Sequence, residues 1–160
     1  MPLLMKFPGI TGEGTVQDHV GWLALLRFNW GGTRTLRTQA TASHRNATRI
    51  MPPQLRSASV QRKSDSQSAL LWLNMVNATE VPKITLEWLR TGTAAPVCYF
   101  SVEFANVRIS RIAEDSTGDH PVETLTLLYR SVTLGVRDVG NALTGAQDMV
   151  TYSVPQHAGG

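Results

Sequence analysis

The chain has 160 residues, of which 42% are hydrophobic and 17% charged, and its formal net charge is +3. This length suits one domain with a core of its own, and we expect a single domain over residues 1–160. No run of 18 apolar residues predicts a membrane-spanning helix, and the first ten residues do not resemble a secretory signal. Charged residues are scarcer than the roughly 25% of ordinary domains, which favours a permanent oligomer whose contacts cover part of the surface.

Two strands are predicted near the N-terminus. Leu3–Ile10 is a short apolar run that ends in a turn rich in Gly and Thr. Gly21–Trp30 alternates in period two, which predicts one strand with an aromatic face in the core. The aromatic side carries Trp22, Phe28 and Trp30, and the opposite side carries Arg27 and Asn29. A ligand platform is the alternative for the aromatic side, but core packing is the commoner use of such a stripe.

A long polar stretch follows at Gly31–Met51 and shows neither a helical nor a strand period. Loops of this length are uncommon in compact domains unless they are functional, so we expect a protruding, extended arm. No acidic residue occurs from Gly31 to Ser64. The candidates for a ring or stacking contact, made with an acidic patch on a neighbouring subunit, are Arg34, Arg37, Arg45 and Arg49. Nucleic acid is a less favoured partner, because no aromatic residue between Trp30 and Trp72 offers a stacking surface for bases.

One short helix is predicted at Gln67–Val76. The oxygens of Ser64–Ser66 suit a helix start, and Pro82 forbids continuation. The helix is apolar on nearly every side, so we expect it to be covered on both flanks, by the sheet and by a neighbouring subunit. Strands of ordinary pattern are predicted on either side of it, at Gln54–Arg62 and Lys83–Arg90.

The C-terminal half predicts strands that bend. Val97–Ile112 changes the phase of its apolar residues near Ala105–Asn106, and a second change occurs near Arg130–Ser131. A phase change of this kind indicates a β-bulge or a corner, which a sheet needs in order to curl. A last strand is predicted at Met149–Val154, followed by a frayed tail at 155–160. The predicted fold is mainly β: a small antiparallel two-sheet β-barrel with one short α-helix packed on its side and a long extended loop.

No set of residues predicts an active site. His19 and His120 each follow an aspartate in a predicted turn, where local capping is the commoner role. Metal-ligand spacings, nucleophile elbows, phosphate loops and dinucleotide motifs are missing from the sequence. Cys98 stands alone in an apolar run, which predicts a buried, inert thiol. We therefore expect no enzymatic activity, no catalytic residues, no bound metal and no cofactor.

Several segments follow one another in a recognisable order. They are the turn Gly9–Gly14, the strand region Asp18–Gly31, the segment Val81–Leu86, the strand Pro121–Tyr129 and the closing strand Val150–Gln156. Together they resemble the haemolysin-coregulated protein (Hcp) family, the tail-tube subunits of the bacterial type VI secretion system. Gly14 stands where that family has a serine, and Ala78-Thr79 stand where it has Gly-Lys. The chain therefore resembles a divergent member.

The resemblance implies a two-sheet β-barrel and head-to-tail hexameric rings that stack into a tube. The implied partners are further copies of the chain, a contractile sheath, spike (VgrG-like) and baseplate proteins, and effector proteins in the lumen, with no membrane partner. The implied route leads from the bacterial cytoplasm out of the cell or into target cells, through the type VI machine and without a signal peptide. The resemblance also places the strand with Arg27 and Asn29 on the channel wall, so both are lumen-facing candidates.

Two other interpretations stay open. The chain is compatible with a monomeric β-barrel binding module whose basic arm binds nucleic acid or an acidic partner. It is also compatible with a tail-tube protein of a phage or another contractile particle, which has the same ring architecture without secreted cargo.

Overall fold

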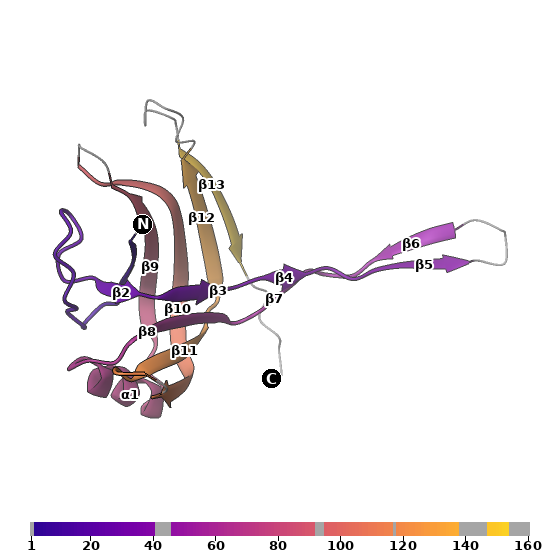
Figure 1. Ribbon diagram of the computed structural model, residues 1–160. Coiled ribbons are helices and arrows are strands. Elements are labelled where there is room, and N and C mark those ends of the chain that lie inside the picture. Colours follow the sequence, from indigo (N-terminus) through magenta and orange to yellow (C-terminus); the bar gives the residue numbers. More distant parts are fainter. Residues whose placement is uncertain (1, 41–45, 92–94, 117, 138–146, 154–160) are drawn as a thin grey trace.

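The computed structural model describes residues 2–40, 46–91, 95–116, 118–137 and 147–153, and Figure 1 shows their arrangement. The elements in chain order are β1 (Leu3–Lys6), β2 (Leu23–Leu25), β3 (Arg27–Asn29), β4 (Gly32–Thr33), β5 (Leu36–Ala40), β6 (Asn46–Ile50), β7 (Gln54–Leu55), β8 (Ala58–Lys63), α1 (Ser68–Val76), β9 (Val81–Arg90), β10 (Val97–Asp115), β11 (Val122–Leu128), β12 (Ser131–Arg137) and β13 (Gln147–Ser153). The mainly β fold with one short helix is confirmed. The predicted tail at 155–160 lies outside the described residues.

Nine strands form one antiparallel array in the order β2-β1-β9-β10-β11-β8-β3, and β12 and β13 join it through β10. In Figure 1, β9, β10, β12 and β13 lie along one axis in alternating directions, and β3, β8 and β11 cross them. The predicted closed barrel is not found: β2 and β3 stand at the two ends of the paired order and do not pair with each other. The fold is thus a bent array of antiparallel strands.

The corner of the array lies in β10. Its first half pairs with β9 and β12, whereas from Arg108 onward it pairs with β11. Asn106 lies at the junction with a φ of 52°, a left-handed conformation that asparagine tolerates better than most residues. The strand is also interrupted between β11 and β12, where the N–H of Arg130 donates to the carbonyl of Ala105 (3.0 Å). The predicted bend near Ala105–Asn106 is confirmed, and the second predicted irregularity lies beside it.

The prediction of one uninterrupted strand at Gly21–Trp30 is wrong. β2 pairs with β1, whereas β3 pairs with β8, and a bend at Leu26 separates them. A strict period of two would place Leu25 and Phe28 on opposite faces. Because the strand changes sheets at Leu26, Leu25 is buried and Phe28 also packs against the core. The bend allows Leu23 and Leu25 to be buried while Phe28 and Trp30, half-buried, also pack against the core, and it leaves Leu26 54% exposed.

The predicted long loop contains paired strands. β4 pairs with β7, and β5 pairs with β6, so the segment is a long hairpin that Figure 1 shows extending away from the body. The side chains of residues 33–36 and 50–51 are exposed. A hairpin with no face against the body needs no alternation of apolar residues, which explains why the sequence shows none. We refer to residues 32–55 as the arm.

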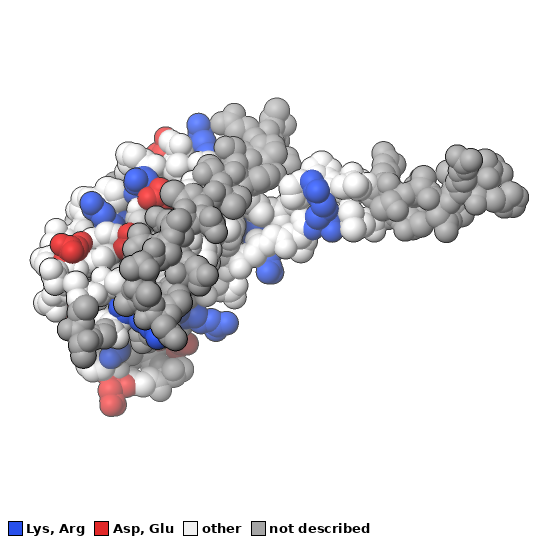
Figure 2. All heavy atoms as spheres, turned by 90° about the horizontal axis from the view of Figure 1, so that it is seen from above, with Lys and Arg blue, Asp and Glu red and all other residues white. Residues whose placement is uncertain are grey.

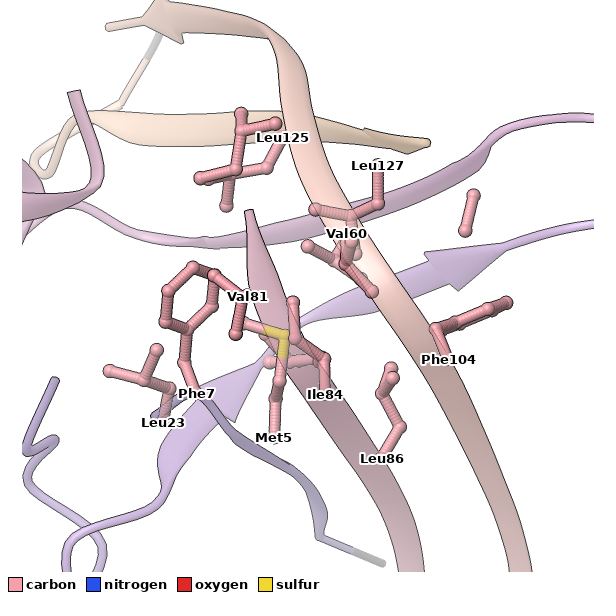
Figure 3. Close-up of a cluster of buried hydrophobic side chains, with 14 of the residues drawn as sticks. Met5, Phe7, Leu23, Val60, Val81, Ile84, Leu86, Phe104, Leu125 and Leu127 are labelled. Carbon is pink, nitrogen blue, oxygen red and sulfur yellow. The ribbon is translucent and has the colours of Figure 1, made fainter. Parts of the chain in front are cut away.

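The core lies between the crossing strands. Fully buried apolar side chains from β1, β8, β9, β10 and β11 meet there, and Figure 3 shows Met5, Val60, Ile84, Phe104 and Leu127 among them. Leu71 is the buried residue that α1 contributes to this cluster. In the described part of the chain, no helix has the length and hydrophobicity needed to cross a membrane.

Candidate functional site

The outer face of β3, β8 and β11 carries mostly uncharged polar side chains. Directly paired residues in antiparallel strands share a face, so the register defines which side chains lie together. Two cross-strand rows result: Asn29–Ser59–Thr126 and Arg27–Gln61–Thr124. Between these rows, Phe28, Val60 and Leu125 point to the opposite side, toward the core. We call the outer side the polar face, and both Arg27 and Asn29 are exposed on it.

Two adjoining recesses indent the polar face. The first has a volume of about 160 Å³ and is lined by Arg27, Asn29, Ser59, Gln61 and Thr124. The second has a volume of about 230 Å³ and is lined by Asn29, Trp30, Gly31, Arg56, Ser57 and Ser59. The recesses share Asn29 and Ser59, and the described residues that line each of them include one arginine and no acidic residue.

Aromatic side chains hold β3 beneath these recesses. Phe28 meets Trp88 edge to face, with 5.2 Å between ring centroids, and Trp30 meets Phe104 at 6.0 Å. The indole N–H of Trp30 donates to the hydroxyl of Tyr129 (2.5 Å), which donates to the carbonyl of Arg56 (2.7 Å). Asn29 therefore lies between two residues whose rings are fixed by packing.

The third predicted core aromatic has a different environment. Trp22 is half-buried outside the core cluster and packs its ring against His19, with 4.5 Å between centroids. His19 pairs with the carboxylate of Glu87 through Nε2 and contacts the carbonyl of Gln17 through Nδ1 (3.0 Å). Burial opposes a charged ring, but the hydrogen bonds to Glu87 and Gln17 outweigh it, so the pKa of His19 is raised. The sequence indicated a local turn here and did not indicate the partner on β9.

A buried charged cluster joins β8, β11 and the start of α1. Arg62 and Glu123 are 2% and 0% exposed and form an ion pair, and Arg62 also contacts Asp65 (2.5 Å). Asp65 accepts a hydrogen bond from the N–H of Gln67 (2.9 Å), so one predicted polar residue contacts the backbone just before α1, although the N-cap itself is Gln67 and makes no side-chain capping bond. Burial raises the pKa of Glu123. Sequence reasoning missed this cluster, because nothing local pairs residues 61 positions apart.

One side of α1 is apolar and open. Leu71 is buried, whereas Leu70, Leu73 and Val76 are 43%, 54% and 69% exposed. These three residues recur every third position, which places them on one side of the helix. Trp72 is anchored at the edge, where its indole donates to Glu114 (3.0 Å). We call Leu70, Leu73 and Val76 the open face of α1.

The arm also exposes apolar side chains. Leu36 and Ile50 are paired across β5 and β6, and each is 62% exposed. Arg34 is exposed at the start of the arm, and Figure 2 shows positive but no negative side chains on the described part of the arm. Arg37 and Arg49 lie opposite each other in the backbone register, but their side chains lie outside the described residues, as does all of Arg45.

In the described part of the chain, no three side chains of His, Cys, Asp or Glu are grouped in a way that holds a metal ion. Cys98 was predicted to be buried and is half-buried, with its Sγ 3.4 Å from the carbonyl oxygen of Phe100.

Sequence reasoning found Arg27 and Asn29 but missed the rest of the polar face. The signal was present in β8 and β11, where Ser59 and Gln61 alternate with Ala58 and Val60, and where Thr124 precedes Leu125. No such pattern indicated Arg56, because its position depends on a hydrogen bond from its backbone N–H to the carbonyl of Gly31, which is distant in the sequence.

The sequence and the fold both match known proteins of one family. The family model described as "Type VI secretion system effector, Hcp" matches residues 4–135. The fold is similar to that of a solved type six secretion system protein, with 20% identity, a TM-score of 0.84 and coverage of 96% of this chain and 95% of the other. No curated protein matches the sequence significantly.

Two further solved structures share the fold. A type VI secretion system effector from Yersinia pestis has 17% identity and a TM-score of 0.72, and the match covers 95% of this chain and 99% of that one. Hcp1 from Salmonella typhimurium has 16% identity and a TM-score of 0.72, and the match covers 95% and 93%. Because the family model spans most of the sequence and the fold agrees over nearly the whole chain, the chain belongs to the Hcp family of type VI secretion system proteins.

Proposed function

We propose that this chain is a structural subunit of the type VI inner tube. Its copies close head-to-tail into hexameric rings, the rings stack into a tube, and the tube leaves the cell with effectors in its lumen. The sheath, spike and baseplate proteins of the same machine are its other partners. Beyond family membership, one observation carries this proposal: a single chain exposes two separate apolar surfaces, one on the arm and one on α1.

The two surfaces are both apolar and exposed, so each can cover the other when two copies meet. Leu36 and Ile50 form one apolar patch on the arm, and the open face of α1 forms the other. The arm and α1 are widely separated in Figure 1, so the arm does not cover the helix of its own chain. Exposed apolar patches of this kind mark interaction surfaces in soluble proteins. The arm of one copy packs on α1 of another copy in this proposal.

A contact between two different surfaces of the same chain is heterologous. Such contacts form closed rings when the rotation between copies divides a full turn, and open filaments otherwise. The arginines of the arm add a basic edge to the contact, with Arg34 as the described member. The acidic groups that meet this edge lie on the body of the neighbouring copy, since the arm has none.

The polar face lines the lumen in this arrangement, so Arg27 and Asn29 are lumen-facing. Hydroxyl and amide groups are well hydrated and give passenger proteins no large apolar area to adhere to. A wall of this composition suits transport of a protein that is later released.

Native mass spectrometry combined with negative-stain images tests the proposal. We expect a mass of six chains and end-on views of a ring with an open centre. A chain that stays monomeric when concentrated contradicts the tube function and leaves only the fold in common with the family.

A further inference from the structure

Arg27 and Arg56 are cations whose side chains have no partner among the described residues. The side chain of Arg27 makes no ion pair or hydrogen bond within that part of the chain, although Gln61 lies directly opposite it in the register. Arg56 uses its backbone N–H and carbonyl, which bond to Gly31 and Tyr129, while its guanidinium faces the second recess. The buried Arg62, by contrast, is paired with two carboxylates. Within the described residues, the polar face therefore has two positive charges without an ionic partner, each in a recess.

The groups around these arginines are hydrogen-bond donors. The first recess adds the amides of Asn29 and Gln61 and the hydroxyls of Ser59 and Thr124, and the second adds Ser57. A guanidinium donates through up to five N–H groups and accepts none, so its partner must be an acceptor. A carboxylate accepts in a bidentate manner and carries the opposite charge, which makes it the best match. The smaller recess has room for about five water molecules, which is the scale of one side chain.

We propose that the two recesses bind two carboxylate side chains of an acidic segment on the passenger protein, with Arg27 and Arg56 as the anchoring residues. This inference rests on the proposed function, which turns the polar face toward the lumen, and it adds the chemical class of the passenger. Nucleic acid fits less well, because Trp30 is the one aromatic residue among the described residues that line the recesses, and it is half-buried with its indole N–H engaged by Tyr129.

Gly31 leaves room for the guanidinium of Arg56 beside the second recess. A Cβ atom added at Gly31 would lie 2.8 Å from the Nη2 atom of Arg56, which is closer than such contacts allow. The substitution Gly31→Ala therefore moves the guanidinium out of its place without changing the charge of the protein. The variant therefore tests whether binding depends on where the Arg56 guanidinium lies, because its charge is unchanged.

The test measures binding of a fluorescently labelled hexaglutamate peptide by fluorescence anisotropy at low ionic strength. The native chain is compared with R27Q, R56Q, the double variant and G31A. The matched control is R90Q, which removes one positive charge at the exposed end of β9, away from the polar face. A Ser-Gly peptide of equal length and a labelled single-stranded oligonucleotide serve as alternative probes.

We expect R27Q and R56Q each to weaken hexaglutamate binding about tenfold, the loss typical of one hydrogen-bonded charge contact. G31A should weaken it by several-fold, R90Q by about twofold or less, and the Ser-Gly peptide should not bind. Equal losses in R27Q and R90Q, or no binding of hexaglutamate by the native chain, would overturn the proposal. Tighter binding of the oligonucleotide that is lost in R27Q would also overturn it, in favour of nucleic acid.

The native mass of each variant is recorded in the same buffer, which separates this inference from the proposed function. Both recesses lie within one chain, so a monomer can be tested as well as a ring. A monomer with binding that depends on Arg27 contradicts the tube and supports the recesses. A hexamer that does not bind the peptide contradicts the recesses and supports the tube.

Discussion

The polar face and the arm are both built from paired antiparallel strands, yet they differ in what lies behind them. The strands of the polar face turn Phe28, Val60 and Leu125 into the core, so a single chain determines their position. The arm has paired backbones but exposes Leu36 and Ile50. Strand pairing alone therefore does not identify a region that is stable within one chain. What covers the apolar side chains decides whether a segment is complete within one chain or depends on another copy.

The largest expected effect comes from truncating one buried and one exposed apolar residue. Phe104 is fully buried and packs against Phe28, Trp30 and Tyr129. Phe104→Ala should lower the free energy of unfolding by about 3–5 kcal/mol, measured by urea denaturation. Leu36→Ala should change that free energy by no more than about 0.5 kcal/mol in the monomer while reducing ring formation. Equal losses of stability at the two positions would contradict the comparison.

Breaking the buried ion pair should have a similar or somewhat smaller effect. Arg62→Ala leaves Glu123 buried without its partner, and loss of one member of a buried pair costs about 3–5 kcal/mol. The expected loss is at the low end of that range, because Glu123, with its raised pKa, can take up a proton. Urea denaturation of Arg62→Ala and of the control Lys63→Ala, an exposed neighbour, measures it. A loss as small as that of the control would show that the pair does not stabilise the body.

A smaller effect is expected from pH at His19. The folded state raises the pKa of His19, so its pairing with Glu87 stabilises the fold below the pKa of the unfolded chain, about 6.5. The contribution is lost as pH rises through the folded pKa. The stability difference between the native chain and His19→Gln should therefore be larger at about pH 6 than at about pH 9. His120→Gln is the control because His120 is exposed, and a difference that grows with rising pH would contradict the assignment.

The smallest expected effect is that of salt on assembly. Exposed ion pairs contribute about 0–1 kcal/mol each, and the screening length falls from about 8 Å to about 3 Å between physiological and molar salt. If arginines of the arm such as Arg34 meet acidic groups of a neighbour, tubes should become shorter as salt rises. Light scattering across a salt series measures this. Tubes that are indifferent to salt would assign the contact to the apolar surfaces alone.

Much of the body is predictable because its signals are local. The helix was expected at Gln67–Val76 and is found at Ser68–Val76, and the corner was expected where Asn106 adopts its left-handed conformation. The polarity of Arg27 and Asn29 between large apolar residues also identified the outer face of β3. Periodicity and capping act over a few residues, so one sequence reveals them.

The rest depends on contacts between residues far apart in the chain. The bend at Leu26 arises because β2 and β3 find partners in different parts of the array, and no local pattern indicates that change. The same holds for His19 with Glu87 and for Arg62 with Glu123. The arm was predicted to be a loop because its sequence shows no period of two, and the described side chains at 33–36 and 50–51 are exposed.

Cross-linking between copies tests most directly whether the arm of one copy packs on α1 of another. A chain with Leu36→Cys and Leu73→Cys, on a Cys98→Ser background, would be oxidised and separated on a denaturing gel. We expect a ladder of covalent species up to six chains, which neither single-cysteine chain forms. Monomer bands alone, from a sample whose native mass is that of a ring, would contradict the contact.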